Sequence, residues 1–266
     1  MDFKSILVVL DYTPSSAARL RLAIRLATQH GARLSGLYAV TRSFFESKQN
    51  EAASHIDAVQ ADFILATGQA GIDARWIGVD EVTVGADVAE IVNQHAYYCD
   101  LLVVGQNEPG AAEGSLPGDL PERVVLGSGR PVLIVPYSGT FEHCGARIML
   151  AWKSGRESAR AANDALPLLK KATEVRVADV NTPSSDATQA ERLCAYLALH
   201  GVTAKPEHII VEEITVGDAL LNRISDEGDD LLVMGAVAHT RFGSLTPGDV
   251  ARHILKHMTV PVLMSH

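Results

Sequence analysis

The chain has 266 residues, 47% of them hydrophobic and 21% charged, and its 32 acidic and 23 basic side chains give a net charge of −9. This composition excludes a disordered chain or a fibre, and the acidic balance argues against a nucleic-acid-binding protein. The three cysteines, Cys99, Cys144 and Cys194, form neither a disulfide pattern nor a metal-binding pattern. No apolar run reaches the ~18–20 residues of a membrane span, and the N-terminal apolar run is too short for a signal peptide. We therefore expect a cytoplasmic protein that does not bind membranes.

The first half of the chain alternates short apolar runs with amphipathic segments. The runs that read as buried strands are Ile6–Leu10, Leu34–Val40, Ala74–Val79, Leu101–Gly105 and Val132–Val135. The segments that read as helices are Ser15–Gly31, Glu51–Gly68, Ala86–Tyr97 and a last one beginning at Asp119. Strands separated by helices predict parallel pairing through right-handed crossovers.

The chain contains an internal duplication. Three segments of the first half recur 130 residues later without a change of register: Asp100–Gln106 at Asp230–Ala236, Pro117–Asp119 at Pro247–Asp249, and Pro131–Val135 at Pro261–Ser265. The first strand, Ile6–Asp11, recurs at Ile148–Lys153, an offset of 142. About a dozen extra residues therefore lie between these landmarks in the first half, and we assign them to Thr41–Asn50.

The duplication predicts two copies of one domain, 1–138 and 145–266. The predicted fold class is α/β, with two repeated doubly wound domains, each a five-stranded parallel sheet flanked by helices. Ligands of such sheets bind beyond the carboxyl ends of the strands. Two loops end there in each half: the loop after the first strand, and a glycine-containing loop that leads into a helix N-terminus and is a natural anion site.

The glycine loops carry a resemblance to a known family. The second half reads "VMGAVAHTRFGSLTPGDVARHILKHMTVPVLMSH" and begins with "AWKSGRESARA". These segments resemble the universal stress protein family in its tandem form, which has the adenine nucleotide alpha hydrolase-like fold and the fingerprint Gly-x2-Gly-x9-Gly-Ser/Thr. The resemblance implies that the glycines and the Ser/Thr hold ATP phosphates, and that a residue ending the first strand helps to define the adenine pocket.

The positions that the resemblance assigns to ligand binding fall in both halves. They are Asp11, Gly105 and Gly118 in the first half, and Ala151, Lys153, Gly235, Ala238, His239, Arg241, Gly248 and Asp249 in the second. In the first half, Glu108 and Asp119 replace fingerprint residues and Glu113 adds a third carboxylate, so we expect no phosphate binding there. In the second half, Ala238 and Asp249 replace fingerprint residues, while His239, Arg241 and Lys153 supply positive charge.

Several residues favour structural roles. We expect Asp119, with Glu122 at capping-box spacing, and Asp249 to cap their helices and so compete with phosphate. His253 and His257 have the i, i+4 spacing of metal ligands, but we interpret them as part of a basic helix face. Cys99 reads as a small buried side chain. Trp152 reads as a sheet-face or interface residue.

The sequence lacks Walker A, Gly-x-Ser-x-Gly, pyrophosphate-loop and dinucleotide fingerprints. We therefore predict a non-catalytic, stress-related binding or regulatory protein without a metal. The alternative is an ATP-binding protein with slow or no hydrolysis, with ATP in the second half only. We expect the halves to pair through their last strands as a pseudo-dimer, since apolar edge strands need partners. Homodimerisation and an unidentified protein partner are further expectations.

Overall fold

A computed structural model gives the fold of the protein. It describes residues 2–39, 49–79, 87–110, 115–180, 189–236, 238–241 and 244–266, with the backbone alone at 49–54, 238–241 and 244–246. The described chain forms two compact units, Asp2–Thr140 and Phe141–His266. No helix among the described residues is long and apolar enough to cross a membrane.

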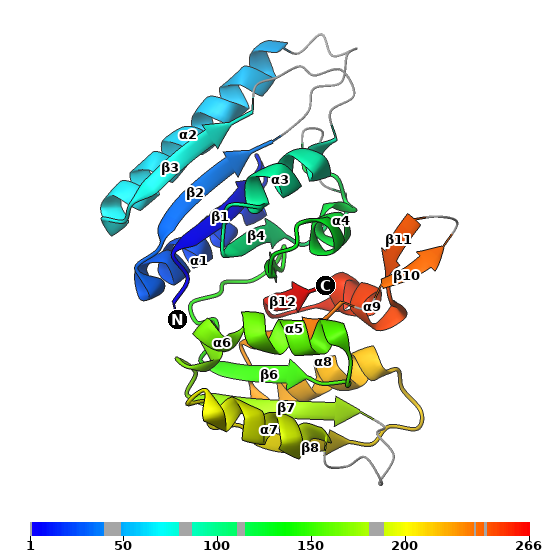
Figure 1. The fold of residues 1–266 in the computed structure, drawn as a ribbon. Helices are drawn as coiled ribbons and strands as arrows, with labels where there is room; N and C mark the ends of the chain where they lie inside the picture. Colours follow the sequence, from blue (N-terminus) through cyan, green and yellow to red (C-terminus); the bar gives the residue numbers. More distant parts are fainter. Residues whose placement is uncertain are drawn as a thin grey trace. The chain divides into compact units, whose positions relative to one another are not determined.

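The first unit alternates strands and helices as its sequence predicts (Figure 1). Its elements are β1 (Ser5–Leu10), α1 (Pro14–His30), β2 (Arg33–Tyr38), α2 (Gln49–Ala70), β3 (Ala74–Gly78), α3 (Val88–Ala96), β4 (Leu101–Gly105), α4 (Leu120–Gly127) and β5 (Val132–Val135). The strands pair in parallel in the order β3-β2-β1-β4-β5. The order reverses at β1 and β4, so the loops after these two strands meet at the switch point where ligands of doubly wound folds bind.

Helix α1 shows how the sequence places side chains at this switch point. The helix starts at Pro14, which suits the first helical turn, and ends at Gly31, whose φ of 59° is the left-handed value that glycine adopts readily. Its buried face includes Arg19, Leu22 and Leu26. Because these residues follow helical spacing, an arginine is packed on the sheet beside leucines.

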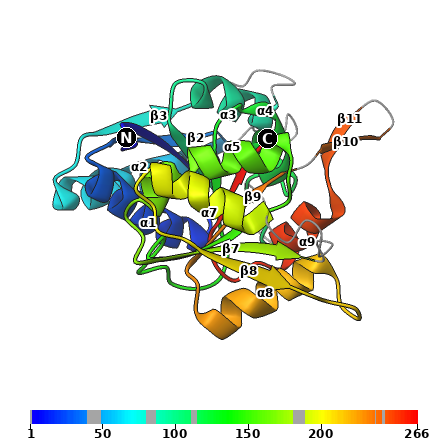
Figure 2. The ribbon, with the colours of Figure 1, turned by 60° about the horizontal axis from the view of Figure 1, so that its bottom comes forward.

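The second unit repeats this architecture. Its elements are β6 (Arg147–Ala151), α5 (Arg156–Asp164), α6 (Leu166–Leu169), β7 (Glu174–Val180), α7 (Gln189–Leu199), β8 (Lys205–Ile209), α8 (Val216–Glu227), β9 (Leu231–Gly235), β10 (Ala238–Arg241), β11 (Ser244–Pro247), α9 (Asp249–His257) and β12 (Val262–Ser265). The parallel order is β12-β9-β6-β7-β8. Figure 2 shows α5 and α7 on one face of this sheet and α8 and α9 on the other.

The extra residues of the first half lie mainly in a helix, which corrects their assignment to Thr41–Asn50. Helix α2 has 22 residues, whereas its counterpart α7 has 11. The connection before α2, residues 39–48, is only two residues longer than the one before α7, residues 181–188. The sequence comparison missed this because a longer amphipathic helix leaves no insertion signal of its own. Residues 40–48 lie outside the described part of the chain.

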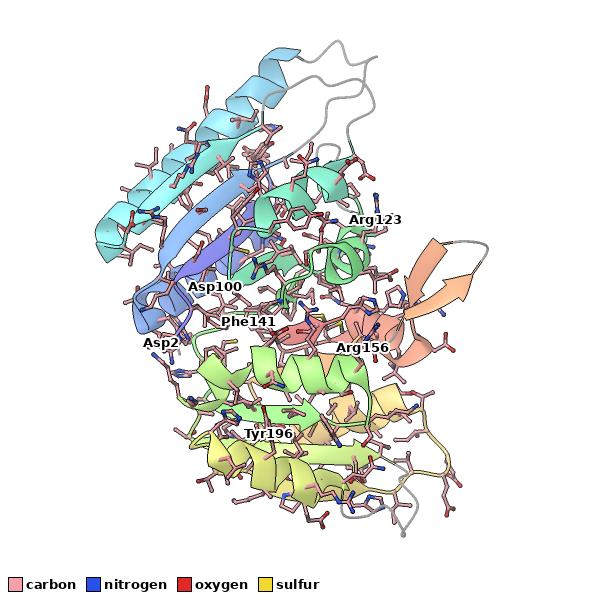
Figure 3. All side chains as sticks on the ribbon, viewed as in Figure 1. Asp2, Asp100, Arg123, Phe141, Arg156 and Tyr196 are labelled. Atoms are coloured by element: carbon pink, nitrogen blue, oxygen red, sulfur yellow. The ribbon has the colours of Figure 1, made fainter. Side chains whose placement is uncertain are left out.

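A repeated carboxylate explains why both "DLLV" motifs begin with aspartate. The Asp100 side chain, labelled in Figure 3, accepts hydrogen bonds from the backbone N–H groups of Lys4 and Ser5 at 2.7 and 3.0 Å. Asp230 accepts from the N–H groups of residues 145–147 at 2.8–3.1 Å. Each aspartate therefore ties the start of its unit's first strand to the strand beside it.

Candidate functional site

A buried ion pair lies at the switch point of the first unit. Asp11, at the end of β1, and Arg19, on the buried face of α1, contact each other at 2.8 Å, and their side chains are only 6% and 3% exposed. The Ser16 hydroxyl accepts a hydrogen bond from the Asp11 N–H at 3.2 Å and from Arg19 at 3.3 Å. The Thr13 hydroxyl donates to Asp11 at 2.6 Å. The charge of the arginine is therefore neutralised within the protein.

Two side chains occupy the space that the glycines of the first half leave open. A Cβ atom added at Gly105 would lie 1.8 Å from Arg19 Nη1, so the guanidinium fills the position beside this glycine. A Cβ atom added at Gly118 would lie 2.9 Å from Asn107 Nδ2. In the first unit, the absence of these two Cβ atoms makes room for the protein's own side chains.

A third contact closes the same edge. Ser15, in the first turn of α1, donates a hydrogen bond to Glu108 Oε2 at 3.1 Å and thereby joins the two loops. The cavity that remains between the loops is about 30 Å³. That volume suits one or two water molecules, whereas small-molecule pockets enclose several hundred Å³.

The second unit replaces each of these contacts. Offsets of 142 and 130 residues place Lys153 at the Asp11 position, Ala161 at the Arg19 position and Ala238 at the Glu108 position. The buried ion pair is thus absent from the described second unit. Instead, the backbone of α5 packs on Gly235, where an added Cβ would lie 2.5 Å from the Glu157 carbonyl carbon and from the Ser158 nitrogen.

A carboxylate is nevertheless present at the second site. Glu157 stands at the position of Ser15, so the first unit contributes its carboxylate from the β4 loop and the second from the first turn of α5. The pKa of Glu157 lies below its usual range, chiefly because its own backbone N–H donates to the carboxylate and also because Arg156 is near. The helix N-terminus that would face a phosphate therefore already has an anionic side chain.

The glycine loop of the second unit is a hairpin rather than an open loop, which differs from the sequence-based expectation. Strands β10 and β11 pair antiparallel, with Ala238 opposite Pro247 at the base (Figure 1). His239 and Arg241 lie on β10, where the structure describes the backbone alone. Gly248, the cap residue of α9, is buried.

The expected capping roles of the two aspartates are wrong. Asp119 occupies the N-cap position of α4, but its side chain makes no capping hydrogen bond and lies 4.0 Å from Arg123. Asp249 is the first residue of α9 rather than its cap, is 93% exposed and pairs with Arg252. Both aspartates turn toward an arginine one helical turn on, because a charged partner is available there. Neither carboxylate blocks its helix N-terminus in the way that we expected.

A family model described as the universal stress protein family matches residues 2–136 and again 146–266. The chain belongs to the universal stress protein family. It is similar over 98% of its length to 97% of a universal stress protein from Archaeoglobus fulgidus, with 16% identity and a TM-score of 0.77. It is also similar over 99% of its length to 92% of a functionally unknown protein from Pseudomonas aeruginosa, with 17% identity and a TM-score of 0.64. No curated protein matches the chain.

The remaining candidate residues of this universal stress protein have structural partners. His253 Nε2 lies 2.8 Å from Asp218 Oδ1, and the rings of His253 and His257 are 4.6 Å apart. The described residues contain no cluster of three or more side chains suited to a metal. Cys99 is a small buried side chain, as predicted, and burial raises its pKa to about 12.

The sequence analysis missed Arg19, the residue that does most to close the first site. The signal was present, because Arg19 falls on the same helical face as Leu22, Ala23 and Leu26. An arginine on the apolar face of a helix requires a buried anion, and Asp11 was already a candidate. Of the three expected carboxylates, the structure brings only Glu108 to the site. Asp119 is exposed, and Glu113 lies outside the described residues.

Proposed function

We propose that this universal stress protein is a non-catalytic binding or regulatory protein of the stress response, in which the first nucleotide-type site is filled by the protein itself. The observation that supports the proposal is the Arg19 guanidinium beside Gly105, paired with the buried Asp11. A phosphate at this edge would have to displace a neutralised arginine and also approach Glu108. Removing one partner of a buried ion pair leaves an uncompensated charge, which is strongly unfavourable.

The second unit differs because nothing equivalent to Arg19 fills its edge. Gly235 and Gly248 are both kept, and Lys153 is exposed next to them in the fingerprint. The Glu157 carboxylate at the start of α5 opposes phosphate, since like charges at short range repel. We therefore infer that this unit accepts ligands without a triphosphate.

The alternative function is an ATP-binding protein with slow or no hydrolysis, with its site in the second unit. The observation that favours it is the uncapped start of α9, where Gly248 offers no side chain and Asp249 turns to Arg252. Backbone N–H groups at a helix N-terminus bind anions readily.

Calorimetry with ATP separates the two functions. We expect no heat of binding at millimolar ATP, no adenine nucleotide in the supernatant of the denatured purified protein and no phosphate release. Glu157→Gln removes the opposing charge and should make weak ATP binding measurable, whereas Glu213→Gln, at an exposed glutamate, should not. Sub-millimolar ATP binding by the unaltered protein would establish the alternative instead.

A further inference from the structure

One row of residues crosses the carboxyl edge of the second sheet. Ser265 is registered with Gly235, and Asp179 with His208. Trp152 continues β6 between them, because Ala151 is registered with both Met234 and Ala178 and the Trp152 N–H donates to the Ala178 carbonyl at 2.7 Å. The polar row, as we name it, is therefore Ser265, Gly235, Trp152, Asp179 and His208, one residue from each strand.

The polar row faces helices α5 and α7. Side chains alternate between the faces of a sheet, so registered residues of parallel strands share one face. The Cβ direction of Gly235 meets the backbone of α5. Arg176 of β7 pairs with Glu227 of α8 on the other face, and Asp179, three residues later, must point the opposite way.

Three buried polar atoms of this row have no hydrogen-bond partner among the described residues: Trp152 Nε1, Asp179 Oδ2 and Ser265 Oγ. Asp179 is 1% exposed, and its other oxygen, Oδ1, bonds His208 Nδ1. Buried polar groups of native proteins are almost always paired, so each unpaired atom calls for an explanation such as a bound molecule. Here, a donor and an acceptor on adjacent strands are unpaired together.

The first unit provides a matched comparison. The same row of its sheet contains Val135, Gly105, Leu10, Tyr38 and Gly78. Leu10 and Val135 carry no polar side-chain atom, and Tyr38 keeps no unpaired buried oxygen in the described structure. A row of this fold therefore does not need polar side chains, and the second unit has acquired Trp152, Asp179, His208 and Ser265 for another reason.

The chemistry of the unpaired atoms defines the ligand. Trp152 Nε1 can only donate a hydrogen bond, and an ionised Asp179 can only accept one. A molecule that satisfies both must present an acceptor next to a donor. An amino group beside a ring nitrogen has this edge, and an anion does not suit a site with Asp179 in the row and Glu157 next to Gly235.

We propose that the polar row of the second unit binds an uncharged aminoheterocycle, whose amino group donates to Asp179 Oδ2 and whose ring nitrogen accepts from Trp152 Nε1. His208 holds the Asp179 carboxylate through Oδ1 and leaves Oδ2 for the ligand. Because His208 is 33% exposed, the row reaches solvent at its β8 end. The proposal goes beyond the proposed function, since it needs no phosphate contact and stands whether or not ATP binds.

Two probes of nearly equal shape test the proposal. In 4-aminopyrimidine, an amino donor stands beside an acceptor nitrogen, and in 4-pyrimidinone, a carbonyl acceptor stands beside an N–H donor. Titration of the full-length protein with each, followed by NMR, should show 4-aminopyrimidine binding about tenfold or more tightly, which corresponds to one buried hydrogen bond that is kept or lost. Equal affinities, or no binding of either probe, would show that only water fills the row.

Substitutions identify the atoms. Trp152→Phe removes the N–H and keeps an aromatic ring, so it should weaken 4-aminopyrimidine about tenfold. Asp179→Asn replaces an acceptor by an amide that also donates, and should move the preference toward 4-pyrimidinone. Tyr38→Phe, at the matched position of the first unit, should leave both affinities unchanged. A folded Asp179→Asn variant, checked by circular dichroism, that keeps the original preference would overturn the proposal.

Discussion

The Asp11–Arg19 pair shows how one residue decides what a site can hold. Both charges are almost completely buried, and Ser16 and Thr13 supply further hydrogen bonds to the pair. A buried ion pair adds little net stability over apolar residues, because desolvation offsets the attraction. Its consequence here is steric and electrostatic: the guanidinium fills the space beside Gly105 and carries no net positive charge for a ligand to use.

Breaking the pair should destabilise the first unit. Arg19→Met leaves the Asp11 carboxylate buried without its cation and should cost about 3–5 kcal/mol of unfolding free energy. Asp11→Asn with Arg19→Met removes both charges and should recover most of that loss. Urea denaturation measures both. A double variant as unstable as Arg19→Met alone would mean that packing of the arginine, rather than charge pairing, holds the site together.

At the scale of elements, periodicity predicted most of the fold. The strands Leu101–Gly105 and Val132–Val135 were predicted to the residue, because short apolar runs between helix signals have one reading. The hairpin β10–β11 was missed, since its antiparallel pairing depends on a turn rather than on an apolar pattern. The polar row was missed because strand register brings together Trp152, Asp179 and Ser265 from distant segments.

The helix pairs behind the two glycine loops are joined by different cations. In the first unit, the Arg123 guanidinium, labelled in Figure 3, bonds both oxygens of Asp87 at the start of α3. In the second, His253 lies 130 residues after Arg123 and bonds Asp218 at the start of α8. The pKa of Asp218 is below its usual range, first because the Thr215 hydroxyl donates to it and further because His253 does. An arginine keeps its charge at every working pH, whereas an imidazole loses it between pH 5 and 8.

The α8–α9 contact should therefore weaken as pH rises. Its carboxylate contribution appears above the usual aspartate pKa and is lost in acid, while its imidazolium contribution is lost as the pH passes from 5 to 8. His253→Arg should raise the thermal midpoint relative to wild type by more at pH 8 than at pH 5, as thermal denaturation measures. Arg123→His should introduce the same pH dependence into the first unit. Parallel pH profiles for wild type and His253→Arg would rule this out.

At the scale of the whole molecule, the duplication has diverged in its sites while keeping its framework. Asp100 and Asp230 perform the same task in both units. Around the glycines, by contrast, the first unit has an ion pair and an apolar row, and the second has Glu157 and the polar row. A stability-driven duplicate has no need for such differences, so the two units have separate tasks, with ligand recognition assigned to the second.

The last strands are where we propose that the two units pair, on the evidence of their sequences. Within its unit, β5 has β4 on one edge, β12 has β9, and the residues of both strands are almost wholly apolar. An edge strand with one neighbour leaves alternate N–H groups without acceptors. Hydrogen exchange of the full chain should therefore show protection of every amide in Val132–Val135 and Val262–Ser265. Protection independent of protein concentration indicates pairing within the chain, whereas protection that falls on dilution indicates a homodimer. Protection of alternate amides only would mean that both edges are open and that the pseudo-dimer does not form through these strands.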